Sequence, residues 1–541
     1  MNSIRRLAAV CLPGSLVLSG LLILGLVMLT TVPGHAQQLT GTISATVYDS
    51  SGAVVPDATI TLKNTASGDI RRTTSDSSGY FTFTAVQPAT YSISVGAKGF
   101  TTWELTGIVI NLGDSKTVPN IALKAGASNT TVEVVADKNV EVPLDTPEIS
   151  DTMNAEQIED LSLEGRDAGE LLKMMPGTAL ASGTANGSNF NPKTTGSNSG
   201  PVGDYAINGF SPYGTMAYML DGANLVDPGN AGTQIANINT DMVQEVKTLT
   251  GSYGAEYAYG PVIFEAFSKS GGKNFHGEAY TYARNSALNS WESYTKESYR
   301  SSITSATSPA AAAALASSDN PYEYFYYIGG NVGGPVIFPH FNRNHDKLFF
   351  WGGYEYMIQH PNNPLQDYNE PTQDQQNGIF DKASNPSSNN GNYSYAYMLP
   401  CQTCSGLAAD ANWTTDSSGN IHIPTTDFDP NITGVLKLYP LPNVTPNGGN
   451  GWSNYAYAPS IPQNRWEATG KLDYAINENT KLSGTYAYQN EVDSHPITIW
   501  WAPPNTLPYP APVSAATNSQ VILGNFTHQF GPTTTSETVF T

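Results

Sequence analysis

Short runs in which apolar and polar residues alternate recur along most of the chain. In one of them Tyr91, Ile93 and Val95 alternate with Ser92 and Ser94, which is typical of a strand with one buried face. Similar runs cover residues 39–48, 58–63, 80–85, 90–95 and 107–112. Several short strands at close intervals predict a compact β-sandwich over residues 37–125.

The turns between these runs repeat one short sequence. Asp-Ser-Ser-Gly occurs at residues 49–52 and again at residues 76–79. Aspartate accepts hydrogen bonds from the backbone of such a turn, and glycine adopts the positive φ that the turn requires. Both segments are therefore predicted to reverse the chain between strands.

The pattern changes over residues 146–272, where short helical stretches alternate with glycine-rich loops. A helix with Ile158 on its apolar face is predicted over residues 154–161. Leu171 and Leu172 form a second apolar face, which ends at a Pro-Gly pair. Together these features predict a separate α+β domain.

From residue 273 onward, strands alternate with connectors of two sizes. Strands are expected over residues 277–284, 324–336, 347–357, 466–474, 481–488, 520–530 and 537–540. The connectors between them run long, short, long, short, long, short, which is the topology of a transmembrane β-barrel. A soluble all-β protein with variable loops is the alternative, and the connector rhythm favours the membrane.

The N-terminus has the layout of a secretory signal peptide. Arg5 and Arg6 precede an apolar run over residues 16–29, and Ala36 stands before the expected cleavage point. An uncleaved membrane anchor is the alternative, but the apolar run is short for a span. We therefore expect residues 1–36 to be removed on export and the mature chain to lie in the outer membrane.

Composition argues against a nucleic-acid-binding protein and against an intrinsically disordered chain. The chain has 541 residues and a formal charge of -21, with only 13% charged residues and 10% aromatic ones. Nucleic-acid binding requires clustered Lys and Arg, which the sequence does not contain. Acidic disordered chains carry more charge and fewer aromatic residues.

Three stretches of the first segment carry a family resemblance. Residues 41–62 read GTISATVYDSSGAVVPDATITL, residues 74–83 read TSDSSGYFTF, and residues 88–100 read PATYSISVGAKGF. They resemble the carboxypeptidase regulatory-like domain, a transthyretin-like sandwich with a carbohydrate-binding-like fold. The resemblance implies an accessory module without a catalytic centre.

Further motifs in the middle of the chain resemble the plug domain of TonB-dependent transporters. They are LSLEGRDAGELLKMMPGT from residue 161, YAINGF from 205, YMLDGAN from 218, VQEVKTLTGSYGAEY from 243 and FSKSGGKNFHGEAYTYARN from 267. In order and spacing they are similar to the Oar-like subgroup, which carries an accessory sandwich. One departure is Gly260-Pro261, where the subgroup has a Gly-Gly pair, so the local plug strand is expected to differ.

The resemblance implies a mainly β fold in five parts. They are a signal peptide over residues 1–36, a sandwich over 37–125, a linker with a TonB box over 126–145, an α+β plug over 146–272, and the first strands of an antiparallel outer-membrane barrel over 273–541. Plugged transporters have about 22 strands, whereas only about seven are expected here. We therefore expect an incomplete chain, and not one that inserts alone, because open strand edges in lipid leave backbone groups unpaired.

The resemblance also implies site residues. The linker contains a loose version of the TonB-box strand, formed by Thr131, Val132, Glu133, Val134, Val135 and Ala136, although such Val-rich runs are common in any β protein. In the family this strand pairs with a periplasmic energy-coupling protein by edge addition. The residues expected to shape the plug are Arg166, Asn208, Gly209, Asp221 and Gly222.

Candidate chemistry elsewhere is sparse. Cys401 and Cys404 predict a local disulfide after export rather than a redox pair or zinc site. His340 and His345 lie in an expected turn, where solvated side chains are more common than metal ligands. A Ser-x-x-Lys match at residues 270–273 contains a Gly-Gly pair that disfavours the required helix. No catalytic residue, metal site or cofactor is therefore predicted.

Two functions remain open from the sequence. The first is an outer-membrane TonB-dependent receptor that takes up an unidentified solute, with lipid and an energy-coupling protein as partners and no nucleic acid. The second is a surface carbohydrate-binding or adhesion protein, with a groove near Tyr48, Tyr80 or Trp103 on the sandwich. Aromatic residues in the long connectors would stack on a sugar ring, but the same rings occur in any aromatic girdle or loop core, so they assign no solute. An enzyme is not expected.

Overall fold

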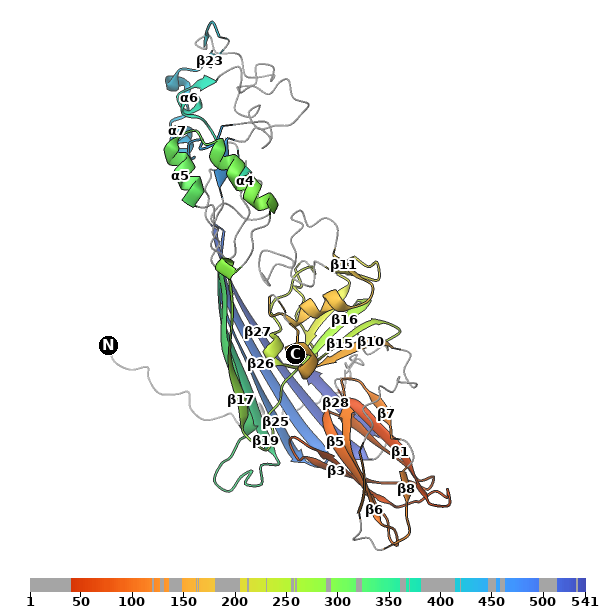
Figure 1. Ribbon diagram of the computed structural model, residues 1–541. Coiled ribbons are helices and arrows are strands. Elements are labelled where there is room, and N and C mark those ends of the chain that lie inside the picture. The colour runs from red at the N-terminus through yellow and green to blue at the C-terminus, as the bar shows by residue number, and fades with distance from the viewer. Residues whose placement is uncertain are drawn as a thin grey trace, which may run out of the picture.

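A computed structural model gives the fold of the chain (Figure 1). It describes residues 40–118, 121–126, 131–135, 148–161, 163, 165–180, 205–211, 214–229, 231–253, 257, 260–288, 293–317, 324–360, 366–368, 370–380, 414–418, 420–445, 454–457, 463–495, 513–531 and 534–541. The predicted signal peptide, Ala136, Cys401 and Cys404 lie outside the described residues.

The N-terminal unit is a sandwich of two sheets. Its strands are β1 (Gly41–Asp49), β2 (Thr59–Asn64), β3 (Ile70–Thr74), β4 (Tyr80–Val86), β5 (Ala89–Gly96), β6 (Thr102–Ile110), β7 (Ser115–Thr117), β8 (Ile121–Leu123) and β9 (Thr131–Val135). One sheet has β1 between β4 and the short strands β7 and β8, and the other has the order β3-β2-β5-β6-β9. Strand β9 pairs in parallel with β6.

The sandwich core follows the predicted alternation at its apolar positions, but Ser92, which was predicted on the opposite face, is also buried. Ile93 and Val95 are fully buried and Tyr91 is nearly so. Both predicted Asp-Ser-Ser-Gly turns form as expected. Asp49 Oδ1 accepts the backbone N–H of Ser51 at 2.8 Å, and Asp76 makes the equivalent contact in its own turn. Trp103 is also buried, so it does not supply the exposed ring that a sugar groove there requires.

The second unit, the plug, contains a mixed five-stranded sheet. Its elements are β10 (Ile149–Asn154), α2 (Ala155–Glu159), the 3-10 helices η1 (Ala168–Met174) and η2 (Thr240–Met242), β11 (Thr178–Leu180), β12 (Tyr205–Ile207), β13 (Met216–Leu220), β14 (Ala223–Asn224), β15 (Val243–Gly251) and β16 (Val262–Ser268). The sheet order is β10-β15-β16-β13-β14. Strand β16 begins directly after Pro261, which cannot donate to a ladder.

The third unit is a curved wall of seven antiparallel strands in sequence order (Figure 1). They are β17 (His276–Asn285), β18 (Tyr324–Pro335), β19 (Leu348–His360), β25 (Gln463–Asn477), β26 (Thr480–His495), β27 (Val513–Gly531) and β28 (Thr534–Phe540). Six of them exceed the predicted length because pairing continues beyond the apolar part of each strand. All seven predicted strands are present in the described part of the chain.

The two faces of the wall differ in polarity. Residues facing the plug include Glu355, Glu467 and Lys471, which are buried. Residues facing away include Leu472 and Ile522, which are more than half exposed. This alternation of a polar inner face and an apolar outer face is that of a barrel wall in lipid.

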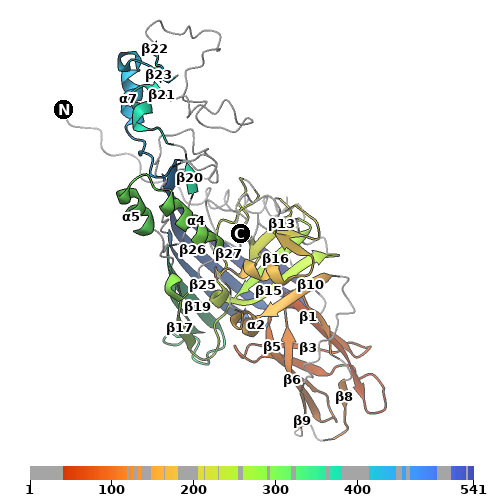
Figure 2. The ribbon, with the colours of Figure 1, turned by 45° about the horizontal axis from the view of Figure 1, so that its top comes forward.

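The long connectors form a layer at one end of the wall, on the side away from the sandwich (Figures 1 and 2). Its elements are η3 (Ser286–Leu288), α4 (Ser293–Thr304), α5 (Pro309–Ser317), β20 (Gln366–Tyr368), α6 (Gln373–Gln376), β21 (Ile379–Phe380), β22 (Thr414–Thr415), β23 (Ile421–His422), η5 (Thr425–Asp427), α7 (Pro430–Leu436) and β24 (Tyr455–Tyr457). Separate connectors pair here, since Thr307 N–H donates to Asn443 O at 3.2 Å. Across the residues with assigned positions, none of the helices combines the length and apolar character of a membrane span.

Candidate plug–barrel interface

A buried arginine joins the plug to the wall. Arg166 lies just before η1 with a positive φ of 58°. Its guanidinium forms one ion pair with Asp241 of η2 and donates through Nε to Glu355 Oε2 of β19 at 3.2 Å. The same group lies 3.8 Å from the ring centroid of Tyr282 on β17. One plug side chain therefore contacts two wall strands, through charge on one and through an aromatic face on the other.

The residue after this arginine organises the plug itself. Asp167 is fully buried and caps η1, because its Oδ1 accepts the N–H of Gly169 at 2.7 Å. It also accepts hydrogen bonds from the Tyr218 hydroxyl and from Gln234 Nε2. Burial raises the pKa of Asp167, while these three hydrogen bonds act in the opposite direction. Burial also holds the pKa of Tyr218 well above its usual range.

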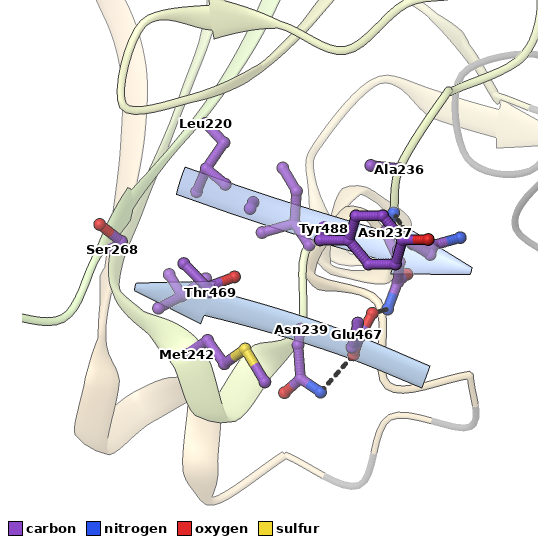
Figure 3. A pocket seen from close by; sticks show the side chains of 13 residues that line it. Leu220, Ala236, Asn237, Asn239, Met242, Ser268, Glu467, Thr469 and Tyr488 are labelled. Atoms are coloured by element: carbon purple, nitrogen blue, oxygen red, sulfur yellow. Dashed lines mark hydrogen bonds between the residues drawn. The ribbon is translucent and has the colours of Figure 1, made fainter. Parts of the chain in front are cut away.

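A second set of contacts crosses the interface beside a cavity of about 20 Å³, which has room for one water molecule (Figure 3). Asn239 Nδ2 of the plug donates to Glu467 Oε1 of β25 at 2.6 Å. The backbone N–H of Asn237 donates to Gln489 Oε1 of β26 at 2.7 Å. Polar side chains of the wall thus satisfy backbone and amide donors of the plug.

The third set of contacts is built on a tight turn. Asp221 and Gly222 both have positive φ and connect β13 to β14, which is a type I′ hairpin. Asp221 accepts the Ser268 N–H at 2.8 Å and the Thr485 hydroxyl of β26, also at 2.8 Å. Lys471 of β25 lies 3.7 Å from the same carboxylate. The turn therefore ties the end of β16 to the wall.

Another carboxyl is buried within the plug sheet. Glu265 is 1% exposed, and neither of its oxygens has a hydrogen-bond partner in the part of the chain with assigned positions. Burial raises its pKa to about 8, and the charges of Asp221, Glu245 and Glu537 act in the same direction. Lys247, its cross-strand neighbour on β15, acts in the opposite direction.

The residues predicted from the sequence have different places in this interface. Arg166 and Asp221 contact the wall directly, whereas Gly222 shapes the turn. Asn208 and Gly209 form a second turn with positive φ after β12, and Asn208 N–H donates to Gly177 O at 3.0 Å. Thr131–Val135 lie in β9 on the sandwich. His340 and His345 lie in the β18–β19 turn, and no metal-binding group of three occurs among the residues that the structure places.

Sequence reasoning did not identify the wall partners of the plug. They include Glu355, Glu467, Lys471, Thr485 and Gln489. The available signal was the placement of charged residues within tyrosine- and glycine-rich strands, as at Glu355. Their plug partners are separated from them by up to 264 residues in the chain, so no local pattern pairs them.

Three protein families match successive parts of the sequence. Residues 42–124 match the carboxypeptidase regulatory-like domain, residues 142–262 match the TonB-dependent receptor plug domain, and residues 267–541 match the outer membrane beta barrel domain. The plug and barrel families are receptor and transporter domains and not enzymes. These families also do not favour the alternative function, which is a surface carbohydrate-binding or adhesion protein.

No curated protein matches the chain. Among solved structures it is similar to the outer membrane transporter YddB from Escherichia coli, with 11% identity, 70% of this chain and 37% of that chain covered, and a TM-score of 0.40. It is also similar to the siderophore receptor PirA from Pseudomonas aeruginosa, with 10% identity, coverage of 72% and 39%, and a TM-score of 0.32. The chain spans less than half the length of either protein. By its longest match the chain belongs to the outer membrane beta barrel domain family, and its three domains together have the architecture of a TonB-dependent receptor.

Proposed function

We propose that this chain is part of an outer-membrane receptor of the Oar-like subgroup, which takes up a solute when a TonB-type protein withdraws the plug. The observation that supports this proposal is the chemistry of the plug–wall contact. Charged and amide side chains make many of the contacts, and among the described wall residues Val521 and Leu523 belong to the apolar core of the plug, with Ala487 and Val539 packed against it.

A polar interface suits a domain that must leave and return. A buried ion pair contributes little net stability, because the desolvation of both charges offsets their attraction. When the plug moves, water can take over the hydrogen bonds of Arg166, Glu355 and Glu467. An apolar interface of equal area would instead be exposed to water when the plug moves, at a free-energy cost of about 25 cal/mol per Å².

The proposed contact for the energy-coupling protein is Thr131–Ala136. Within the described residues β9 is the terminal strand of its sheet, so one edge faces away from β6. A partner strand could pair with that edge through main-chain hydrogen bonds. Because β9 lies between the sandwich and the plug in the chain, a pull on it acts on both units.

The proposed solute site is the connector layer beyond the wall. Its aromatic side chains would stack on a sugar ring, so a carbohydrate is the first solute class to test. Tyr324 already stacks on His360 at the end of the wall, with ring centroids 4.3 Å apart.

Photo-crosslinking in intact cells tests the partner contact. A photoreactive phenylalanine analogue placed at Val134 should crosslink to the TonB-type protein. The same analogue at Lys124, an exposed residue after β8, serves as the matched control and should not crosslink. Equal crosslinking at both positions, or none at Val134, would contradict the proposed contact.

A further inference from the structure

The sandwich contacts both of the other units at once. Figure 1 shows it beside β28 and next to the ends of the wall strands, below the plug. Its loop after β6 reaches the plug, and its β2–β3 turn reaches the wall. Such a double contact matters because the plug is the unit expected to move, whereas the wall stays in the membrane.

On the plug side, two ionisable residues of β15 contact a single residue of the sandwich. Glu245 Oε1 accepts the N–H of Leu112 at 2.5 Å, and Lys247 Nζ donates to the carbonyl oxygen of Leu112 at 3.0 Å. Lys247 also forms an ion pair with Glu148 at 2.9 Å. Asp114 stabilises the loop, since its Oδ2 accepts the N–H of Asn111 at 2.9 Å.

On the wall side, the contacts are charge pairs at the β25–β26 turn. Lys481 of β26 forms an ion pair with Asp69 of the sandwich, and Glu478 forms one with Arg72. Lys481 and Asp69 are the less exposed pair, with side chains 18% and 13% accessible. At the next turn, Arg71 Nη2 donates to Gln529 Oε1 at 2.6 Å.

The space between the three units is incompletely packed, and both polar and apolar side chains line it. A cavity of about 220 Å³ is lined by the sandwich at Asp69, by the plug at Gln244 and by the wall at Asp473 and Lys481. Permanent interfaces pack as closely as protein interiors, whereas transient ones are wetter and more polar. This cavity therefore indicates a contact that can open.

We propose that the sandwich is a releasable strap that holds the plug to the barrel wall. It binds the plug through the contacts of Leu112, and it binds the wall through the Asp69–Lys481 ion pair. Strand β9 pairs with β6, which leads directly into the Leu112 loop. A pull on β9 therefore acts on the contacts of the sandwich before it acts on the plug. The proposal rests on the proposed withdrawal of the plug, but it does not depend on which solute the receptor takes up.

Hydrogen exchange of the full-length chain in detergent micelles tests the strap. Lys481→Glu places like charges together at the wall contact, so peptides covering residues 105–118 should exchange about tenfold faster. The double variant Asp69→Lys with Lys481→Glu restores opposite charges and should restore protection. Lys347→Glu makes the same charge change on an exposed side chain at another turn of the wall and should have no effect.

Unchanged exchange of residues 105–118 in Lys481→Glu would overturn the proposal, as would a double variant that remains unprotected. If the wall variant folds poorly, Asp69→Asn removes the same pair from the sandwich side with nearly the same shape. It should also speed exchange in this region, and an unchanged rate would again overturn the strap. Loss of crosslinking at Val134 would contradict only the proposed partner contact.

Discussion

Replacement of Arg166 by Met should strongly destabilise the docked plug. The arginine side chain is 8% exposed, and its partners Asp241 and Glu355 are 7% and 1% exposed. Methionine fills similar volume but leaves two buried carboxylates without their cation. Loss of one member of a buried ion pair costs about 3–5 kcal/mol. Arg166→Lys should cost less, because it keeps the charge and loses only the forked geometry.

Hydrogen exchange is the suitable assay, because a protein of three domains does not unfold in one step. Peptides from η1 and η2 report opening of the plug. A loss of about 3–5 kcal/mol corresponds to exchange that is roughly a hundred to several thousand times faster. Peptides from β2 and β5 of the sandwich serve as an internal control and should not change.

A double-mutant cycle separates the ion pair from other effects of the substitution. Glu355→Gln removes one of the charges that Arg166→Met leaves unpaired. The double variant should therefore be more stable than the sum of the two single changes predicts, by about 1–3 kcal/mol. An Arg166→Met protein with less than fivefold faster exchange, or a cycle with no coupling, would refute the view that this pair anchors the plug.

The other predictions concern pH, a turn and the sandwich core. Burial raises the pKa of Glu245 and of Glu265 to about 8, above the usual value of 4.5, so the folded state binds protons more tightly than the unfolded state. The contribution of these two groups to the stability of the plug should therefore be greatest below about pH 4.5. It should fall by about 1.4 kcal/mol per pH unit for each group up to about pH 8. Hydrogen exchange of β16 peptides measures this stability, and Glu265→Gln should make it depend less steeply on pH. Gly222→Ala should weaken the β13–β14 turn by about 1 kcal/mol because φ is 87° there, whereas Gly470→Ala on the wall should be neutral in the same exchange assay. Ile93→Ala should cost the sandwich about 2–5 kcal/mol, seen as faster exchange confined to residues 40–118.

The alternation of apolar and polar residues predicted most strands, but this prediction failed where the buried side of a strand changes. Strand β6 was expected over residues 107–112 and instead begins at Thr102. Trp103 and Leu105 point inward, then Gly107 adopts a φ of 80° and the inward positions shift to Ile108 and Ile110. This β-bulge breaks the period of two on which the prediction depends.

The connector layer and the domain contacts could not be predicted for a different reason. Residues 309–317 have high intrinsic helix propensity, yet they were assigned only to a connector because no apolar face marks a helix there. Arg166 was singled out from its motif, but its partner Glu355 lies 189 residues away. Contacts at that separation depend on how whole domains dock, which no local pattern encodes.

The connector layer has a consequence for how such receptors diversify. Its segments hydrogen bond to one another, as when Glu370 N–H donates to Asn454 Oδ1 at 2.7 Å, across 84 residues of chain. Because these contacts stay within the layer, substitutions there should leave the register of the wall strands unchanged. In the proposed receptor, the contacts with the solute would therefore be able to change while the wall and the plug–wall contacts stay the same.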